Sequence, residues 1–215
     1  MKTHSLSIHA LILIAVALSC FNPINAADYD SEEFQSAYQQ YLAVSGDEGG
    51  SAKKLAQQWQ DIYADDVNDP LALVLLGSSH TLMGRDALMP WSKMNHTEKG
   101  LDEMSLAVRL LQDQHKTQLF EQMPVYLHVK TTAAITFSQV PEFFGRHEDG
   151  YYLFEDVLSD PVFLAMPVQA QTYVYYYAIS AALQVDKSEQ AAQWQTDLAA
   201  KGFSDDYTAA AAELE

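Results

Sequence analysis

Two arginines are the side chains whose type and position point most directly to recognition chemistry, because basic residues are scarce in this sequence. The 215 residues include 12 Lys and Arg against 29 Asp and Glu, a formal net charge of −17. Arg85 and Arg146 each follow a glycine at a predicted helix corner, where a guanidinium is suited to gripping a carboxylate or a peptide terminus. Alternatively, each arginine ties its own corner, through helix C-terminal carbonyls and ion pairs with Asp86 or Glu148.

Aromatic side chains accompany both corners. Trp91 follows the first corner, which we place at Gly84-Arg85-Asp86, and Phe143 and Phe144 directly precede the second. Large aromatic residues are favoured contacts at protein interfaces. These three residues are therefore candidate partner-binding residues together with the arginines, and we expect the two corners to share one rim.

A run of tyrosines, Tyr173 and Tyr175 to Tyr177, supplies the other candidates. Three consecutive residues on a helix span about 200° of its circumference at 3.6 residues per turn, so they cannot all face a core. We expect two of these side chains to pack inside and at least one to reach a concave surface. Tyr175 and Tyr176 are the predicted partner contacts.

The patterns of a catalytic or metal site are missing from the sequence. There is no His-Glu-x-x-His, no Gly-x-Ser-x-Gly and no Gly-rich phosphate loop, which excludes the commonest zinc, hydrolase and nucleotide sites. His80 lies on an apolar helical face, where a hydrogen-bonded core histidine is expected. The acids between Asp65 and Asp69 lack the glycine and distant glutamate of a calcium loop. We predict no enzyme activity, no cofactor and no metal.

Residues 1–26 are predicted to be a secretory signal peptide, with Lys2 before the apolar run Leu11 to Leu18 and a cleavage position after Ala26. Cys20, the single cysteine, offers a second interpretation, because Val16 to Cys20 resembles a bacterial lipobox. Cys20 is then a possible lipidation site. Both interpretations place the protein outside the cytoplasm, in the periplasm or envelope of a bacterium. The acidic charge argues against nucleic acid as a partner.

The elements that must position the candidate residues all have helical periodicity. Apolar residues recur at steps of three and four, and caps, glycines and prolines separate the segments. One helix is predicted to open on a capping box formed by Asp186 and Glu189, and Ser204 is predicted to cap a tail helix. We predict about eight main helices in four antiparallel hairpins, near residues 31–45, 51–63, 70–83, 90–111, 124–139, 147–158, 167–183 and 187–201, before a C-terminal tail or capping helix in 204–215.

This pattern resembles the tetratricopeptide (TPR) repeat, which pairs two short antiparallel helices. Asn68-Asp69-Pro70 is similar to the end of a repeat, Leu76-Gly77 to the start of the next, and Gly100 and Ala107 to its small contact residues. The middle of the chain also resembles an uncharacterised group of bacterial exported TPR-like proteins, through Gly84 to Asp86, Pro90 to Met94 and Val140 to Arg146. The resemblance implies an all-α fold of stacked hairpins, a TPR-like α-solenoid, over residues 27–203.

Helix arrays of this kind present a concave surface to protein or peptide partners. We therefore expect an exported, non-catalytic scaffold that binds a protein or peptide partner in the cell envelope, with membrane contact only through a lipid anchor at Cys20. The alternative class is a small-ligand-binding protein or an enzyme acting on cell-envelope material. A buried carboxylate with a raised pKa inside a closed cavity would favour that alternative.

Overall fold

The computed structural model describes residues 28–46 and 48–215, so the predicted signal peptide and Cys20 lie outside the described residues. Within these ranges the fold is all-α, as predicted, apart from one two-stranded hairpin. The helices are α1 (Glu32–Ser45), α2 (Ala52–Asp65), α3 (Pro70–Asp86), α4 (Pro90–Arg109), α5 (Val125–Gln139), α6 (His147–Ser159), α7 (Pro161–Leu164), α8 (Thr172–Gln184), α9 (Ser188–Ala200) and α10 (Asp206–Ala212).

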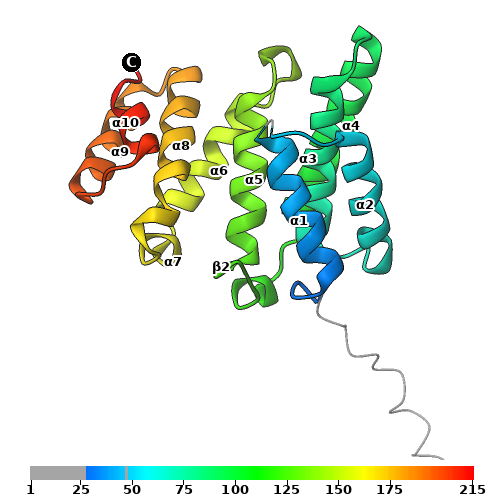
Figure 1. The fold of residues 1–215 in the computed structure, drawn as a ribbon. Coiled ribbons are helices and arrows are strands. Elements are labelled where there is room, and N and C mark those ends of the chain that lie inside the picture. Colours follow the sequence, from blue (N-terminus) through cyan, green and yellow to red (C-terminus); the bar gives the residue numbers. More distant parts are fainter. Residues whose placement is uncertain (1–27, 47) are drawn as a thin grey trace, which may run out of the picture.

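Neighbouring helices are stacked in chain order (Figure 1). Helix α3 packs against α2 and α4, α5 packs against α3 and α6, and α8 packs against α6 and α9. Helix α10 closes the C-terminal end by packing on α8 and α9. This arrangement is compatible with a helical repeat fold, since each hairpin buries its apolar face against the next.

The core consists of two apolar clusters that meet on α5. Val129, Ala133 and Phe137 belong to the first cluster, which continues through α1 to α4. Leu127 and Ala134 belong to the second, which continues through α6 to α10. Because helical residues four apart share a face, α5 presents one face to each cluster and joins the two halves of the stack.

Helices α3 and α4 approach each other closely because glycines face each other. A Cβ atom on Gly100 would lie 2.3 Å from the carbonyl oxygen of Gly77. A Cβ on Gly84 would lie 2.2 Å from the Thr97 hydroxyl. The predicted corner at Gly84 to Asp86 is corrected here, because these residues form the last turn of α3 and residues 87–89 connect it to α4.

A short β-hairpin precedes α5, in a stretch where the sequence predicted no strand. Strands β1 (Leu119–Phe120) and β2 (Met123–Pro124) pair across a turn whose residues Glu121 and Gln122 have φ angles of 48° and 63°. Left-handed turns of this type usually contain glycine or asparagine, so Glu121 and Gln122 did not predict a hairpin turn. The hairpin places Phe120 in the first core cluster.

Short 3-10 helices occupy three connections, and several predicted helix starts move. They are η1 (Asp113–Lys116), η2 (Glu142–Phe144) and η3 (Val168–Ala170). Helix α8 begins at Thr172 rather than near Pro167, because η3 comes first. The predicted capping box at Asp186 is wrong: Asp186 has a φ of 59°, and Lys187 precedes α9 without a side-chain cap. Asp205, not Ser204, caps α10.

Over the part of the chain described here, no helix is both long enough and apolar enough to span a bilayer.

Candidate functional site

Six tyrosines from three helices form one group, which we call the tyrosine cluster. Helix α1 contributes two of them, α8 contributes three and α10 contributes one. The members are Tyr38, Tyr41, Tyr173, Tyr176, Tyr177 and Tyr207. Each side chain is half-buried except that of Tyr207, which is exposed. Five of the six pack against the edges of the two core clusters and keep only part of their surface accessible. Amphipathic side chains in such a position are suited to contacting a partner.

Ring contacts join the tyrosines at each end of the cluster. Tyr38 and Tyr41 stack with centroids 6.1 Å apart. The Tyr207 ring lies 5.9 Å from that of Tyr176 and 6.2 Å from that of Tyr173. The α10 helix, predicted as a C-terminal tail or capping helix, therefore supplies a member of the cluster that contacts two others.

The cluster has two ends, on α1 and on α8 with α10, and α5 stands between α1 and α8 in the stack (Figure 1). Burial raises the pKa of Tyr38, and the hydroxyls of Tyr41 and Tyr173 raise it further. Burial raises the pKa of Tyr173 to about 12, with Tyr207 and Tyr41 contributing. The tyrosines of the two ends therefore influence each other electrostatically.

Contacts with the rest of the fold hold the α1 end of the cluster in place. The Tyr38 ring packs edge-on against Phe120 at 4.7 Å. The Tyr41 hydroxyl lies 3.1 Å from the Ser78 hydroxyl on α3. Fixed aromatic side chains lose little conformational freedom on binding, so this end offers a preorganised contact.

Tyr175, one of the two predicted tyrosine contacts, requires correction. It is 2% exposed and belongs to the second core cluster, where its ring lies 6.4 Å from that of Phe163. Lys201 covers it at 5.2 Å from the ring centroid. Tyr176 does lie in the tyrosine cluster. Adjacent residues on a helix point in different directions, so Tyr175 faces the core while Tyr176 faces outward.

Sequence reasoning assigned Tyr38 and Tyr41 to the apolar face of the first helix and did not identify Tyr207. The available signal was the spacing of Tyr38 and Tyr41, which places two amphipathic rings together on one helix face. That spacing does not reveal which distant helix the pair faces.

The ion-pair partners of Arg146 within the fold argue against its predicted role in gripping a ligand. One guanidinium nitrogen lies 3.2 Å from Asp149 and the other 3.2 Å from Asp102 on α4. The guanidinium also lies 5.5 Å from the ring centroid of Phe137. A bound carboxylate would have to displace one of the two acids, so the geometry favours a role in joining α6 to α4.

Arg146→Met should therefore lower the free energy of unfolding by about 1 kcal/mol or less, because the bridge to Asp102 is exposed on the acid side. Urea denaturation of R146M, D102N and the double variant gives the coupling energy, expected to be about 0.5 kcal/mol. Additive effects of the two single changes would contradict a joining role.

Arg85 also has partners within the fold. Its Nε donates to Asp86 at 2.8 Å, and its terminal nitrogen donates to the Val44 carbonyl at 3.3 Å, in the last turn of α1. Lys93 donates to the Arg85 carbonyl at 3.1 Å. These contacts match the alternative interpretation, in which the arginine ties helix ends together.

The aromatic residues at the two corners differ in exposure. Trp91 is 61% exposed and Phe143 is 70% exposed, whereas Phe144 is half-buried against the first core cluster. The two phenylalanine rings are in contact, with centroids 4.3 Å apart. Trp91 and Phe143 are therefore the accessible aromatic residues of the two corners.

His80 is buried and hydrogen-bonded, as predicted. Its Nδ1 lies 2.6 Å from Glu103, and its Nε2 lies 3.1 Å from the Lys99 ammonium. Both partners lie on α4, so this group joins α3 to α4. No group of three or more metal-ligating side chains occurs among the residues described.

A buried carboxylate does occur, at Asp69. Its Oδ1 accepts a hydrogen bond from the Leu71 amide at 2.8 Å and from the Tyr29 hydroxyl at 3.0 Å. Burial raises its pKa to about 6, against the lowering effect of those bonds. Because the carboxylate caps α3 and fastens the segment before α1, its surroundings are those of a structural cap.

Searches of protein families, of curated proteins and of solved structures each found no match to this chain.

Proposed function

We propose that this protein is an exported, non-catalytic, TPR-like scaffold that binds a protein or peptide partner in the bacterial cell envelope. The observation that carries the proposal is the tyrosine cluster. Tyr207 of α10 contacts Tyr173 and Tyr176 of α8, a second pair stacks on α1, and all keep part of their surface accessible. Tyrosine offers a large apolar ring and a hydroxyl at low entropic cost, which suits it to contacting peptides.

The arrangement of the helices supports a binding surface of this kind. Stacked helix pairs leave one face of the array for a partner, and the cluster spans several hairpins of the stack. The net charge of −17 favours a partner segment that is neutral or basic, since complementary charge speeds association. Export and the TPR assignment rest on the sequence patterns of residues 1–26 and of the helix pairs.

The alternative, a small-ligand-binding protein or an enzyme acting on envelope material, has one observation in its favour. Asp69 combines burial with a raised pKa, as a catalytic acid does. Its Oδ1 is occupied by the amide of Leu71 and the hydroxyl of Tyr29, so the scaffold is the better-supported proposal.

Replacing Tyr207, the exposed member of the cluster, together with Tyr176, whose ring it contacts, tests the scaffold. We expect peptides selected from a displayed random library on the native protein to bind Y176S/Y207S about tenfold more weakly or worse, because buried tyrosine contacts dominate interface energies. The measurement is fluorescence anisotropy of the labelled peptides.

The matched control is Y152S, because Tyr152 is 55% exposed and lies on α6, outside the cluster. Its affinity for the same peptides should stay within about twofold of the native value. The proposal fails if Y176S/Y207S retains native affinity, or if the library yields no peptide that distinguishes it from the native protein.

A further inference from the structure

Five large apolar side chains stand in water at the two corners that follow α3 and α5. We call these residues the apolar corners: Leu88, Met89, Trp91 and Met94 at the first, and Phe143 at the second. Their exposed fractions are 93% for Leu88, 48% for Met89, 61% for Trp91, 44% for Met94 and 70% for Phe143. Exposed apolar groups gathered in this way mark an interaction surface more often than chance.

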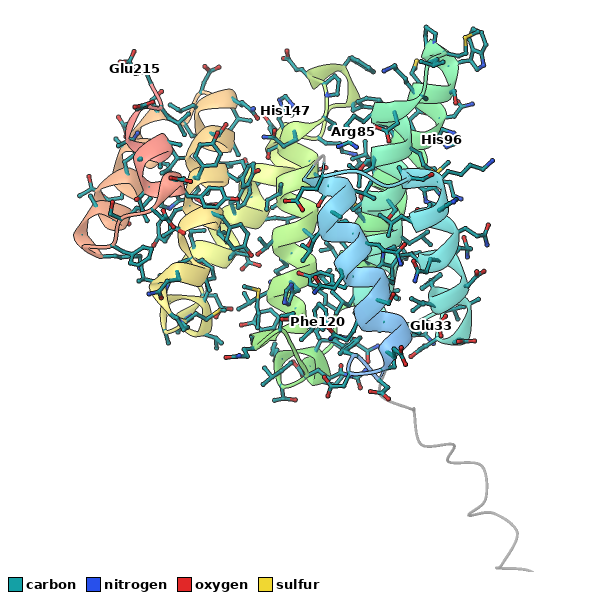
Figure 2. The ribbon with its side chains drawn as sticks, in the orientation of Figure 1. Glu33, Arg85, His96, Phe120, His147 and Glu215 are labelled. Carbon is teal, nitrogen blue, oxygen red and sulfur yellow. The ribbon has the colours of Figure 1, made fainter. Side chains whose placement is uncertain are left out.

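Both corners lie at the same end of the molecule. Helices α3 and α5 pack side by side and run in the same direction, so their C-terminal ends coincide. Figure 2 shows Arg85 and His147, beside the two corners, at one end and Phe120 with Glu33 at the other. The first corner projects past the ends of α1 and α2 (Figure 1). A single extended surface can therefore touch both corners.

The stretch that contains the first corner is not acidic, unlike the chain as a whole. Residues 85–99 contain Arg85, Lys93 and Lys99 against two acids, Asp86 and Glu98, whereas the whole chain has a net charge of −17. Tryptophan and lysine near an apolar tip are typical of the membrane–water interface, where the ring lies at headgroup level and the ammonium stays in water.

A second copy of the chain is a poor occupant for this surface. Stable protein interfaces use roughly 20–30 residues on each partner, far more than five projecting side chains. Two chains that each carry a charge of −17 also repel each other. Convex corners that project from one end fit a broad, deformable apolar surface better than a folded partner.

We propose that the apolar corners insert into the surface of an uncharged lipid bilayer and orient the scaffold on it. Leu88 and Phe143 enter deepest, because they are the most exposed, and Trp91 lies at the level of the headgroups. The proposal does not depend on the tyrosine cluster, which involves other residues.

Trp91 provides a direct readout. The described chain contains two further tryptophans, Trp59 and Trp194, which are 0% and 5% exposed. Adding phosphatidylcholine vesicles to the full protein should shift the Trp91 emission to shorter wavelength. Brominated acyl chains should quench that emission, while the buried tryptophans stay unaffected.

Variants at the corners measure the contribution of each. L88S/M89S should weaken the partition into phosphatidylcholine vesicles about tenfold, and F143S should weaken it several-fold, because the transferred apolar area is lost. The matched control is L119S, since Leu119 is 60% exposed but lies beside Phe120 at the opposite end. L119S should partition like the native protein, and circular dichroism should show all three variants folded.

The dependence of vesicle binding on salt concentration gives an independent test of the proposal. The acidic body of the protein is repelled by anionic vesicles, so binding to vesicles containing phosphatidylglycerol should strengthen as ionic strength rises from about 0.01 M to about 0.15 M. If basic residues held the protein on these vesicles, its binding would instead weaken as the ionic strength rises.

Three outcomes overturn the proposal. The first is a Trp91 emission that vesicles leave unchanged. The second is equal loss of partition in L119S and L88S/M89S. The third is concentration-dependent self-association in sedimentation experiments that L88S/M89S abolishes, since the corners would then bind a second copy. Failure of peptide binding in Y176S/Y207S concerns the scaffold proposal and leaves this one standing.

Discussion

Gly100→Val should destabilise the fold by about 3 kcal/mol or more, the largest effect we expect from a single substitution. The added Cβ would lie 2.3 Å from the Gly77 carbonyl oxygen and 2.9 Å from the Thr81 amide nitrogen. Both are backbone atoms, so only separation of α3 from α4 relieves the overlap. Urea denaturation followed by far-ultraviolet circular dichroism gives the change in unfolding free energy.

Asn95→Val is the matched control, because Asn95 is exposed on the same helix. Asparagine and valine have similar helix propensities, so this change should alter stability by about 0.5 kcal/mol or less. If G100V is within about 1 kcal/mol of the native protein, α3 and α4 do not depend on this close approach.

Asp69→Asn should gain stability relative to the native protein as the pH rises. The pKa of Asp69 is raised by burial from 3.8 to about 6 in the fold. Between these values the folded chain holds a proton that the unfolded chain has released. The free energy of unfolding of the native protein therefore falls as pH rises through this window.

The size of the effect follows from the shift in pKa. At about 1.4 kcal/mol per pKa unit, ionised Asp69 costs the fold about 3 kcal/mol above the window. The asparagine of D69N cannot ionise, and its side-chain oxygen can still accept from the Leu71 amide and the Tyr29 hydroxyl. Guanidinium denaturation of both proteins at about pH 4 and about pH 7 should show the difference growing in favour of D69N.

Comparison of the two proteins at each pH is necessary because His128 acts in the opposite direction. Burial lowers its pKa to about 4, and its Nε2 lies 2.8 Å from the Phe120 carbonyl. The fold is therefore destabilised as pH falls from 6.5 towards 4 through this residue. His128 is present in both proteins, so its contribution cancels. A stability difference that is constant with pH would contradict the raised pKa of Asp69.

The helices themselves were largely predictable. Residues such as Ser51, which caps α2, and Asp69, which caps α3 ahead of Pro70, act within one turn of the chain. Local patterns gave wrong predictions where the same residue type can stand either at a helix cap or in a turn. Aspartate is a common capping residue, but Asp186 lies in a left-handed turn. Glu121 and Gln122 also have positive φ angles, and neither is the glycine that would have predicted such a turn.

The candidate site was predictable only in part. The sequence named Tyr176, Trp91 and Phe143 as candidate contacts; Trp91 and Phe143 are exposed, and Tyr176 is half-buried. It assigned Tyr175 to the same surface, although a rotation of about 100° per residue turns adjacent side chains to different faces. Only the orientation of α8 in the stack decides which of the two faces outward.

The sequence alone determined that the chain forms amphipathic helices and that its charge is strongly acidic. Periodicity and capping are local properties, so they are contained in short stretches of sequence. The tertiary structure alone decided that Tyr207 contacts Tyr173 and Tyr176, and that Arg146 pairs with Asp102. Such pairings depend on how hairpins pack against one another, and no spacing along the chain encodes that geometry.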